Sequence, residues 1–349
     1  MESLLGIIFH SIGGFSSGSF YMPFKKVKNW AWESYWLVGG FFSWLIVPPI
    51  AAYLTIPNFV EIISAASPAI KAFTFSMGLI WGIGGLTYGL GVRYLGMSLG
   101  NSIVLGFCSA SGALVPSIYY NFHPTEGKIS FTDMLHSTGG QLVLLGVAVC
   151  LIGIAISGKA GILKEKDFAV GHEDKDKDFN LTKGLIIAVI SGILSSFFNY
   201  GIEAGKPMAE AAVVSGCNPL FQNNVTYIVL LWGGLTTNFI WCMYLNFKNK
   251  TFGDYTNKQS PITKNILFSA LAGTMWFLQF FFYGMGESKL GNGASSWILH
   301  MATIILTANF WGFYLKEWKG VSKKTFNTFL WGIALIMLSI VLVGIGNSL

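Results

Sequence analysis

Ten long apolar blocks, separated by short polar segments, dominate this sequence of 349 residues. A helix of about 20 apolar residues is long enough to cross the ~30 Å hydrocarbon core of a membrane. We therefore predict an all-α polytopic membrane protein with ten transmembrane helices. No polar stretch is long enough to form a separate soluble domain, so the function must reside within the helix bundle. The blocks cover approximately residues 4–22, 34–56, 70–92, 97–119, 138–157, 182–202, 219–246, 262–284, 293–315 and 325–346.

Lysine and arginine are distributed unevenly between two sets of loops. Eighteen of the 22 Lys and Arg residues follow odd-numbered blocks, and the other four follow even-numbered blocks. Because positively charged loops stay in the cytoplasm, both termini are predicted to face outside. The formal net charge of +6 follows from this rule and is no sign of nucleic-acid binding. The first block has no Lys or Arg before it, so we expect a membrane helix and not a cleaved signal peptide.

A stretch of the third block returns in the eighth. A shift of 195 positions places seven residues of segment 78–96 on identical residues of segment 273–291. The repeating unit is then five blocks, an odd number, so the two halves must be inverted in the membrane, and ligands of such proteins tend to lie between the halves. Chance similarity between two Gly-rich segments is the alternative. The predicted N-terminal five-helix repeat, cytoplasmic linker loop and C-terminal five-helix repeat cover residues 1–157, 158–181 and 182–349.

Glycines mark corresponding places in other blocks. Gly39 and Gly40 in the second block match Gly233 and Gly234 in the seventh, and Gly6 and Gly184 each open a block that later carries two serines. Small residues let membrane helices approach closely, so these positions are expected at helix contacts. A rocking transporter and a static bundle both use such contacts, and the pattern alone does not separate them.

Three ionisable residues inside or beside the apolar blocks are candidates for proton coupling. His10 and His300 lie about a third of the way into the first and ninth blocks, and Glu33 lies at the cytoplasmic start of the second. An ionisable group at the centre of a membrane helix costs roughly 2.5–3.5 kcal/mol on insertion scales, which suggests a function. Histidine titrates near neutrality and suits a proton carrier. The alternatives are neutral imidazoles bonded to neighbouring helices and, for Glu33, a surface ion pair.

Aromatic and amide side chains share helix faces in the repeated blocks. The spacings of 3 and 4 place Trp276, Gln279 and Tyr283 on one face of the eighth block, as Trp81 and Tyr88 share a face of the third. Aromatic rings against C–H faces, with amides and hydroxyls around them, suit a sugar. The alternative is ordinary helix packing. The predicted substrate-binding residues are Trp81, Tyr88, Trp276, Gln279, Tyr283 and Trp297.

The sequence carries no signature of a soluble enzyme. We find no phosphate-binding loop, no dinucleotide fingerprint, no metal-binding histidine pair and no nucleophile elbow, and the four cysteines form no CxxC motif. Neither a cofactor nor a metal is predicted, and uphill transport must therefore draw on an ion gradient. Glu203 and Lys206 are expected in a local charge network at the outer end of the sixth block, and Glu287 and Lys289 in a loop.

Several long motifs resemble the L-rhamnose–proton symporter family of the drug/metabolite transporter superfamily. They occur in order along nearly the whole chain and are rich in Trp, Lys and Pro, which makes them specific. The motifs are YMPFKKVKNWAWESYW at 21–36, RYLGMSLG at 93–100, KPMAEAA at 206–212, WFLQFFFYGMG at 276–286, WILHM at 297–301 and LKEWK at 315–319.

The resemblance implies uptake of L-rhamnose, with L-lyxose or L-mannose as lesser substrates, driven by protons across a bacterial inner membrane. It implies no obligate protein partner beyond the lipid bilayer. The matching motifs support as candidates His10, Lys25, Lys26, Glu33, Arg93, Gln279, Tyr283, Trp297 and His300. The predicted structural or gating charges are Lys25, Lys26, Arg93 and Lys206. Two alternatives stay open: a transporter of the superfamily for another polar or amphipathic solute or ion, and a non-transporting sensor or lipid-linked-sugar enzyme.

Overall fold

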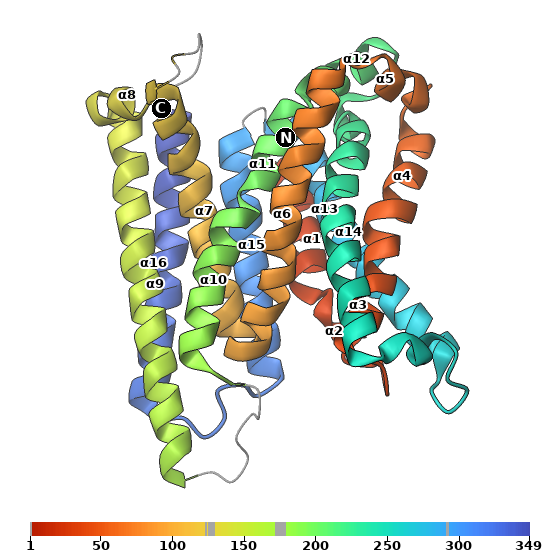
Figure 1. The fold of residues 1–349 in the computed structure, drawn as a ribbon. Helices are drawn as coiled ribbons and strands as arrows, with labels where there is room; N and C mark the ends of the chain where they lie inside the picture. The colour runs from red at the N-terminus through yellow and green to blue at the C-terminus, as the bar shows by residue number, and fades with distance from the viewer. Residues whose placement is uncertain (1, 123, 125–129, 172–178, 291–292) are drawn as a thin grey trace. The chain divides into compact units, whose positions relative to one another are not determined.

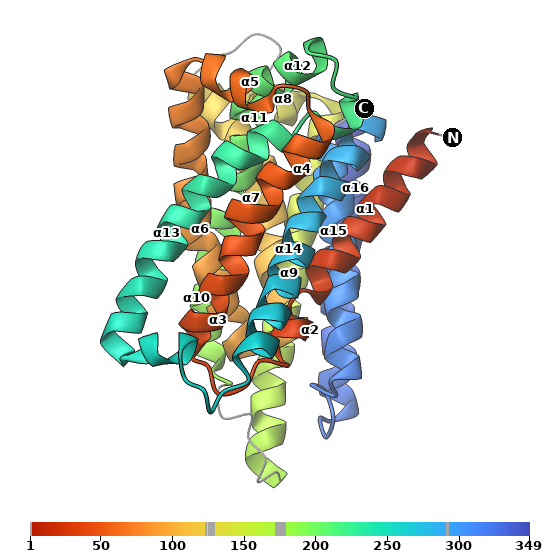
Figure 2. The same ribbon diagram turned by 90° about the vertical axis from the view of Figure 1, so that its right-hand side faces the viewer.

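The computed structural model describes residues 2–122, 124, 130–171, 179–290 and 293–349 of the chain. These residues form helices joined by turns, and no β-strand occurs among them. Figures 1 and 2 show the helices in two views at right angles. The first half contains α1 (Glu2–Ser19), α2 (Tyr21–Phe24), α3 (Trp32–Gly40), η1 (Phe41–Ile46), α4 (Val47–Thr55), α5 (Phe59–Ala65), α6 (Pro68–Leu95), α7 (Met97–Phe122), α8 (Phe131–His136) and α9 (Thr138–Gly171). The second half contains α10 (Leu181–Ser195), α11 (Phe197–Ala204), α12 (Lys206–Val214), η2 (Pro219–Phe221), α13 (Asn224–Asn249), η3 (Thr251–Tyr255), α14 (Ile262–Leu290), α15 (Gly293–Tyr314) and α16 (Lys323–Ser348).

The apolar blocks are helical, and the chain is a multi-pass membrane protein. Seven helical stretches of the described residues are long and apolar enough to cross a membrane. Helices α1, α7 and α15 cover the remaining three blocks but are not among the seven. Ten crossings in two inverted repeats therefore remain a prediction. The seven stretches are Trp32–Thr55, Pro68–Leu95, Thr138–Phe168, Leu181–Val214, Pro219–Asn249, Ile262–Leu290 and Lys323–Gly346.

The second apolar block contains a π-helical segment, η1, directly before α4. Pro48 and Pro49 follow this segment, and neither has an N–H to donate to the preceding turn. A proline ring also clashes with the carbonyl four residues before it, and a wide π turn is one way for a helix to relieve that clash. The consequence is that Ser43 and Trp44, which lie in η1, both point into the protein interior, where each is buried.

The chain divides into two compact units, and each takes residues from both sequence halves. The first unit is Met1–Gly85 with Phe197–Lys289, and the second is Leu86–Ser196 with Leu290–Leu349. The units therefore do not follow the division at residues 157 and 182 that the repeat predicts. The two arrangements are compatible, because helices of one half can pack chiefly against helices of the other.

Glycines that the repeat matches make matching helix contacts within the first unit. A methyl group on Gly78 of α6 would overlap the carbonyl oxygen of Leu230 on α13, beside Gly233. A methyl group on Gly273 of α14 would overlap the carbonyl oxygen of Gly39 on α3. Helix α6 thus packs on α13 as α14 packs on α3, and the paired glycines are where the backbones meet. The two-fold relation between the halves stays a prediction.

Helices α9 and α16 form an antiparallel pair within the second unit (Figures 1 and 2). A methyl group on Gly139 would lie 2.5 Å from the carbonyl oxygen of Gly346, and one on Gly153 would lie 2.9 Å from Ile336. Gly146, midway between them, would bring a methyl group to 3.0 Å from the carbonyl oxygen of Ser339. Glycines spaced by seven residues therefore let the two backbones touch along their length. These helices cover the fifth and tenth apolar blocks, the last of each sequence half.

Helix α9 extends well beyond the fifth apolar block. Residues 158–171, which we expected in the linker loop, are helical, and residues 172–178 lie outside the described part of the chain. The ammonium group of Lys164 lies 5.0 Å, 5.1 Å and 5.5 Å from the ring centroids of Trp318, Phe179 and Phe168. This cation–π contact holds the extension against the loop before α16, so the described part of the linker is packed and not a free tether.

Candidate functional site

Three indole rings from separate elements meet in the first unit. Trp44 of η1, Trp81 of α6 and Trp276 of α14 have ring centroids 5.3–6.3 Å apart. Trp81 and Trp276 are the pair that the repeat matches, and Trp44 joins them because the π turn directs it inward. Such ring separations are those of offset or edge-to-face aromatic contacts. The three rings are named here the indole cluster, and two of them, Trp44 and Trp276, line a cavity.

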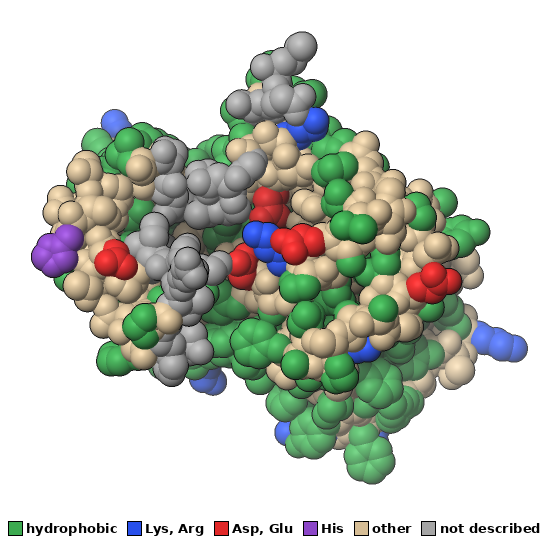
Figure 3. Space-filling view, turned by 90° about the horizontal axis from the view of Figure 1, so that it is seen from above, with side chains coloured by type: hydrophobic (Ala, Val, Ile, Leu, Met, Phe, Trp, Pro, Cys, Tyr) green, Lys and Arg blue, Asp and Glu red, His purple; other side chains and the backbone are tan. Residues whose placement is uncertain are grey.

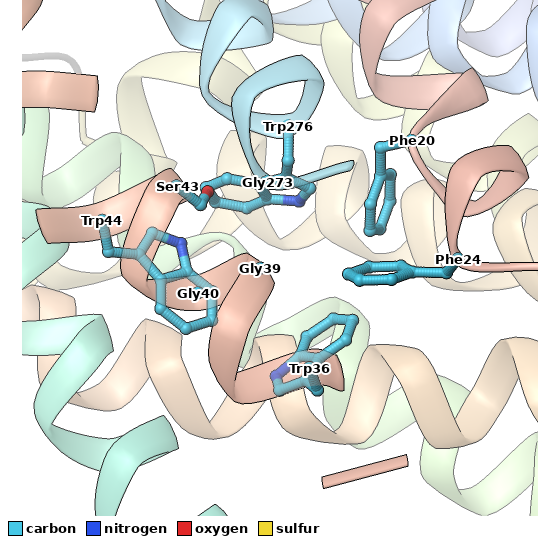
Figure 4. A pocket seen from close by; sticks show the side chains of 9 residues that line it. All are labelled: Phe20, Phe24, Trp36, Gly39, Gly40, Ser43, Trp44, Gly273 and Trp276. Carbon is cyan, nitrogen blue, oxygen red and sulfur yellow. The ribbon is translucent and has the colours of Figure 1, made fainter. Parts of the chain in front are cut away.

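A small cavity of about 20 Å³ lies beside the indole cluster. The close-up in Figure 4 shows aromatic side chains facing it from several elements, with Ser43 and Trp44 on one side. Glycine leaves the space open, since a methyl group on Gly39 would lie 2.6 Å from the ring of Phe24. The lining residues are Phe20, Phe24, Trp36, Gly39, Gly40, Ser43, Trp44, Gly273 and Trp276.

Two buried hydrogen-bonding groups at this cavity have no partner within the described residues. The Ser43 hydroxyl and the Trp44 indole N–H are buried and make no hydrogen bond there. An unpaired buried polar group costs roughly 1–3 kcal/mol, so a ligand or water that bonds to it gains affinity. The cavity volume matches about one water molecule. Pockets that hold small molecules measure roughly 300–1,000 Å³, so a sugar can enter only if surrounding rings move.

One face of α14 carries a continuous row of polar and aromatic side chains. Trp276, Gln279, Tyr283 and Glu287 follow at spacings of 3, 4 and 4, which places them along one side of a helix. The Gln279 amide donates a hydrogen bond of 2.9 Å to the carbonyl of Trp276. Tyr283 is fully buried. The row therefore connects the indole cluster with a carboxylate about three turns further along.

His10 packs against this row from α1. Its imidazole meets the ring of Tyr283 edge to face, with centroids 5.5 Å apart, and the histidine is fully buried. Gly286 makes room for it, because a methyl group there would lie 2.5 Å from His10 Nε2. The repeat matches Gly286 with Gly91, whose added methyl group would lie 3.6 Å from Val104 and 3.8–3.9 Å from Ala188 in the second unit. Equivalent glycines therefore face a histidine in one copy and small aliphatic side chains in the other.

Glu287 is the residue that the sequence analysis missed. We expected Glu287 and Lys289 in a loop, but α14 continues to Leu290 and includes both. The Asn223 side-chain amide donates a hydrogen bond of 2.9 Å to Glu287 Oε2, and Glu203 and Lys206 interact with the carboxylate electrostatically. Figure 3 looks onto the end of the helices where α12 lies, and acidic and basic side chains adjoin one another there. The i+4 spacing from Tyr283 was the signal for a longer helix.

Glu33 has a different setting, at the start of α3. Its carboxylate is buried and accepts hydrogen bonds of 2.9 Å from the amide of Asn249 and from the hydroxyl of Thr251. Nearby, Asp254 accepts 2.7 Å bonds from the backbone N–H of Ala31 and the hydroxyl of Ser34. These bonds attach the start of α3 to the end of α13 and to η3. Glu33 thus fastens two helices, and its proton-coupling role stays a prediction.

The second unit holds the other predicted site residues. The Tyr88 hydroxyl donates a hydrogen bond to the side chain of Asn101. Trp297 and His300 are both buried on α15, and Trp297 packs beside Gly112 of α7. The predicted substrate residues therefore divide into Trp81, Trp276, Gln279 and Tyr283 in the first unit and Tyr88 and Trp297 in the second. A single site containing all six remains a prediction.

The predicted gating charges lie on exposed positions. Lys25 and Lys26 follow α2, Arg93 is in the last turn of α6 and Lys206 begins α12, and all four side chains are exposed. Exposed charges at helix ends fit interface anchoring as well as gating. No group of three or more His, Cys, Asp or Glu side chains in the described ranges is arranged to hold a metal ion.

These features define a multi-pass helical membrane protein whose interior carries aromatic, amide and ionisable side chains. Residues 2–348 match the family described as L-rhamnose-proton symport protein (RhaT). The chain belongs to this family, whose members are transporters and not enzymes. Proteins named L-rhamnose-proton symporter from Yersinia pestis (strain Pestoides F) and Yersinia pseudotuberculosis serotype O:1b (strain IP 31758) are each 41% identical over 350 residues. Each alignment covers 99% of this chain and 98% of the relative.

Proposed function

We propose that this protein imports L-rhamnose together with protons across a bacterial inner membrane, with both termini outside. The observation that carries the proposal is the 41% identity to proteins named L-rhamnose-proton symporter over 99% of this chain. L-lyxose and L-mannose are proposed as lesser substrates. A chain without a nucleotide-binding motif must use an ion gradient for uphill transport, which agrees with proton symport.

The sugar is proposed to bind at the indole cluster and the row on α14. Trp81 and Trp276 offer flat apolar surfaces for the C–H faces of the sugar, and Gln279 offers an amide for its hydroxyls. Ser43 and Trp44, which the sequence analysis did not select, add a hydroxyl and an indole N–H that lack partners. Entry of the sugar displaces rings that now fill the space, and the amide of Gln279 exchanges its bond to its own helix for one to the ligand.

Transport is proposed to proceed by alternating access. Gly78 of α6 packs against α13, and Gly273 of α14 packs against α3. Such glycine contacts give smooth helix surfaces that can pivot without separating long side chains. One proton moving down a potential of 100 mV supplies ~2.3 kcal/mol. Because each 1.4 kcal/mol corresponds to a tenfold concentration ratio, one proton per sugar supports roughly 50-fold accumulation.

The test is a sugar-dependent proton flux with purified protein in sealed liposomes that carry no gradient, with a pH dye outside. Addition of L-rhamnose should make the external medium alkaline, whereas D-glucose and protein-free vesicles should leave it unchanged. Counterflow of labelled L-rhamnose without a pH change would contradict proton coupling. The absence of both signals would contradict the substrate, and a panel of other sugars and amphipathic solutes would then identify the solute.

A further inference from the structure

We infer that Glu287 carries the co-transported proton, and that Asn223 and Lys206 control when it is charged. The inference rests on the proposed function and goes beyond the candidates His10, Glu33 and His300. It starts from the position of Glu287 in the last turn of α14, its hydrogen bond from Asn223, and its electrostatic interactions with Glu203 and Lys206.

The position of Glu287 links it to the proposed sugar site. Trp276, Gln279, Tyr283 and Glu287 lie on one face of α14, and eleven residues of helix span ~16 Å. A rotation or shift of this helix moves the sugar-binding face and the carboxylate together. Because the carboxylate and the sugar-binding side chains share one rigid helix, sugar binding can shift the carboxylate, and protonation of the carboxylate can shift the sugar site.

Side chains from four other elements of the first unit form the cluster around Glu287. From the start of α13, Asn223 donates its hydrogen bond and the Tyr227 phenol lies in the same cluster; Gly284 of α14 leaves room for both. From α11 and α12, Glu203 and Lys206 act on the carboxylate with opposite signs. From α1, His10 contacts Tyr283 one turn before Glu287. The cluster thus contains groups that favour both the charged and the neutral carboxyl.

The proton balance at this site is simple. Loading forms one O–H bond on the Glu287 carboxylate with a proton from the outer medium, and release to the cytoplasm breaks that bond, with no oxidation or reduction. The charged form accepts the hydrogen bond from Asn223 and is stabilised by the positive charge of Lys206. The neutral form relieves the repulsion with Glu203. Movement of Lys206 away from Glu287 therefore favours uptake of the proton.

Desolvation supplies the coupling between proton and sugar. Closing the site over a carboxylate removes the charge from water, which is costly unless the group is paired or neutral. Protonated Glu287 can be enclosed, whereas charged Glu287 cannot be enclosed at comparable cost. The transporter with bound sugar therefore closes only when Glu287 is protonated. Glu33 lacks this freedom, because Asn249 and Thr251 hold its carboxylate at the start of α3.

The decisive comparison is Glu287→Gln against wild type in the same liposomes, with Glu61→Gln as a matched control on an exposed carboxylate of α5. Counterflow measures sugar exchange without net proton movement, and external alkalinisation measures coupling. We expect Glu287→Gln to keep counterflow and to lose rhamnose-driven alkalinisation. In a separate arm with an imposed potential of 100 mV, accumulation should fall from roughly 50-fold in wild type to none in the variant. The control should keep both signals. Alkalinisation by Glu287→Gln at the wild-type ratio to sugar would overturn the inference.

The experiment separates failure of the inference from failure of the proposed function. Absence of rhamnose counterflow in wild type would refute the substrate, and counterflow without alkalinisation in wild type would refute the proton carrier. If Glu287→Gln does not fold, Glu287→Asp serves instead, with rhamnose affinity followed by tryptophan fluorescence across pH. A shifted pH midpoint relative to wild type supports the inference, and an unshifted midpoint overturns it.

Discussion

Helix α14 carries Glu287 at the position where α6 carries Val92, although the two stretches share seven of nineteen residues. The shared residues are a tryptophan, a tyrosine, a leucine and four glycines. A second difference places Gln279 where α6 has Gly84. The two stretches share the glycines at which helices approach, and they differ at the positions of Gln279 and Glu287.

The partners of the two helices differ in the same direction. Gly286 of α14 faces the imidazole of His10, and the matching Gly91 of α6 faces Val104 and Ala188. At these positions, the polar side chains are on or against α14, and the neighbours of α6 are aliphatic. The two stretches therefore share their packing glycines and differ in the polar side chains around them.

The largest effect is expected from adding a methyl group at the matched glycines. Gly78→Ala and Gly273→Ala each place a Cβ atom onto a backbone carbonyl, and only movement of a whole helix relieves the overlap. Overpacking of this kind costs roughly 1–3 kcal/mol or more. Thermal unfolding in detergent should show similar losses for both variants.

Gly85, seven residues after Gly78 on α6, supplies a control for Gly78→Ala and Gly273→Ala. A methyl group on Gly85 comes no closer than 4.0 Å to another atom, so Gly85→Ala should unfold at or slightly above the wild-type temperature. If only one of the two matched variants lost stability, the packing would not be equivalent in the two copies, and the two-fold scaffold would be contradicted.

A smaller effect is expected at Gln279, whose amide has no counterpart at the matching Gly84 of α6. Gln279→Ala removes a proposed hydrogen bond to the sugar, and its present bond is to the backbone of its own helix, so folding should change little. Loss of one hydrogen bond of about 1.4 kcal/mol corresponds to about tenfold weaker L-rhamnose binding. Tryptophan fluorescence measures it, with Gln259→Ala in the exposed loop before α14 as the matched control. Wild-type affinity in Gln279→Ala would move the sugar away from this face.

The same comparison explains what the sequence predicted and what it did not. Apolar length located the helices, and the repeat selected Trp81 and Trp276, which do meet in the structure. Hydropathy ended the eighth block at residue 284, because a glutamate lowers the average even when it lies in a helix, and Glu287 was therefore assigned to a loop. Lys164 and its neighbours concealed the extension of α9 for the same reason.

Residues of η1 were beyond sequence reasoning for a different cause. Ser43 and Trp44 line the cavity because a π turn precedes two prolines and rotates the side chains relative to a regular helix. Periodicity at 3.6 residues cannot anticipate that rotation. The burial of their unpaired polar atoms depends on α6 and α14, which come from other parts of the chain.

A smaller effect is expected where matched glycines face different partners. Gly286→Ala brings a Cβ atom to 2.5 Å from His10 Nε2, so the imidazole must move, at a cost of about 1 kcal/mol. Gly91→Ala meets its neighbours at 3.6–3.9 Å and should be tolerated. Unfolding temperatures of the two variants test this difference.

A double variant identifies the clash as the cause. His10→Ala, combined with Gly286→Ala, gives the second copy the alanine partner that Gly91 has in the first, and should recover part of the stability lost by Gly286→Ala. Additive losses would show that Gly286 acts on the backbone and not through the histidine, and the contact would then have no part in the difference between the copies.

The smallest effect is expected on helix stability outside the membrane helices. The comparison here is between the capped helix start just before α9 and the capped start of α16. Ser130 caps α8, just before α9, and Asp133 completes the capping box, whereas Ser322 caps α16 with Thr325 in the corresponding place. Hydrogen bonds from Ser130 lower the pKa of Asp133. A carboxylate with a lowered pKa stabilises its helix above its usual titration range, and the stabilisation is lost as pH falls through the lowered pKa.

Hydrogen exchange, corrected for its intrinsic pH dependence, should show the amides of α8 losing protection on acidification in wild type. Asp133→Asn should show weaker protection that no longer depends on pH in this range, and an unchanged profile in that variant would mean that Asp133 does not control the start of this helix.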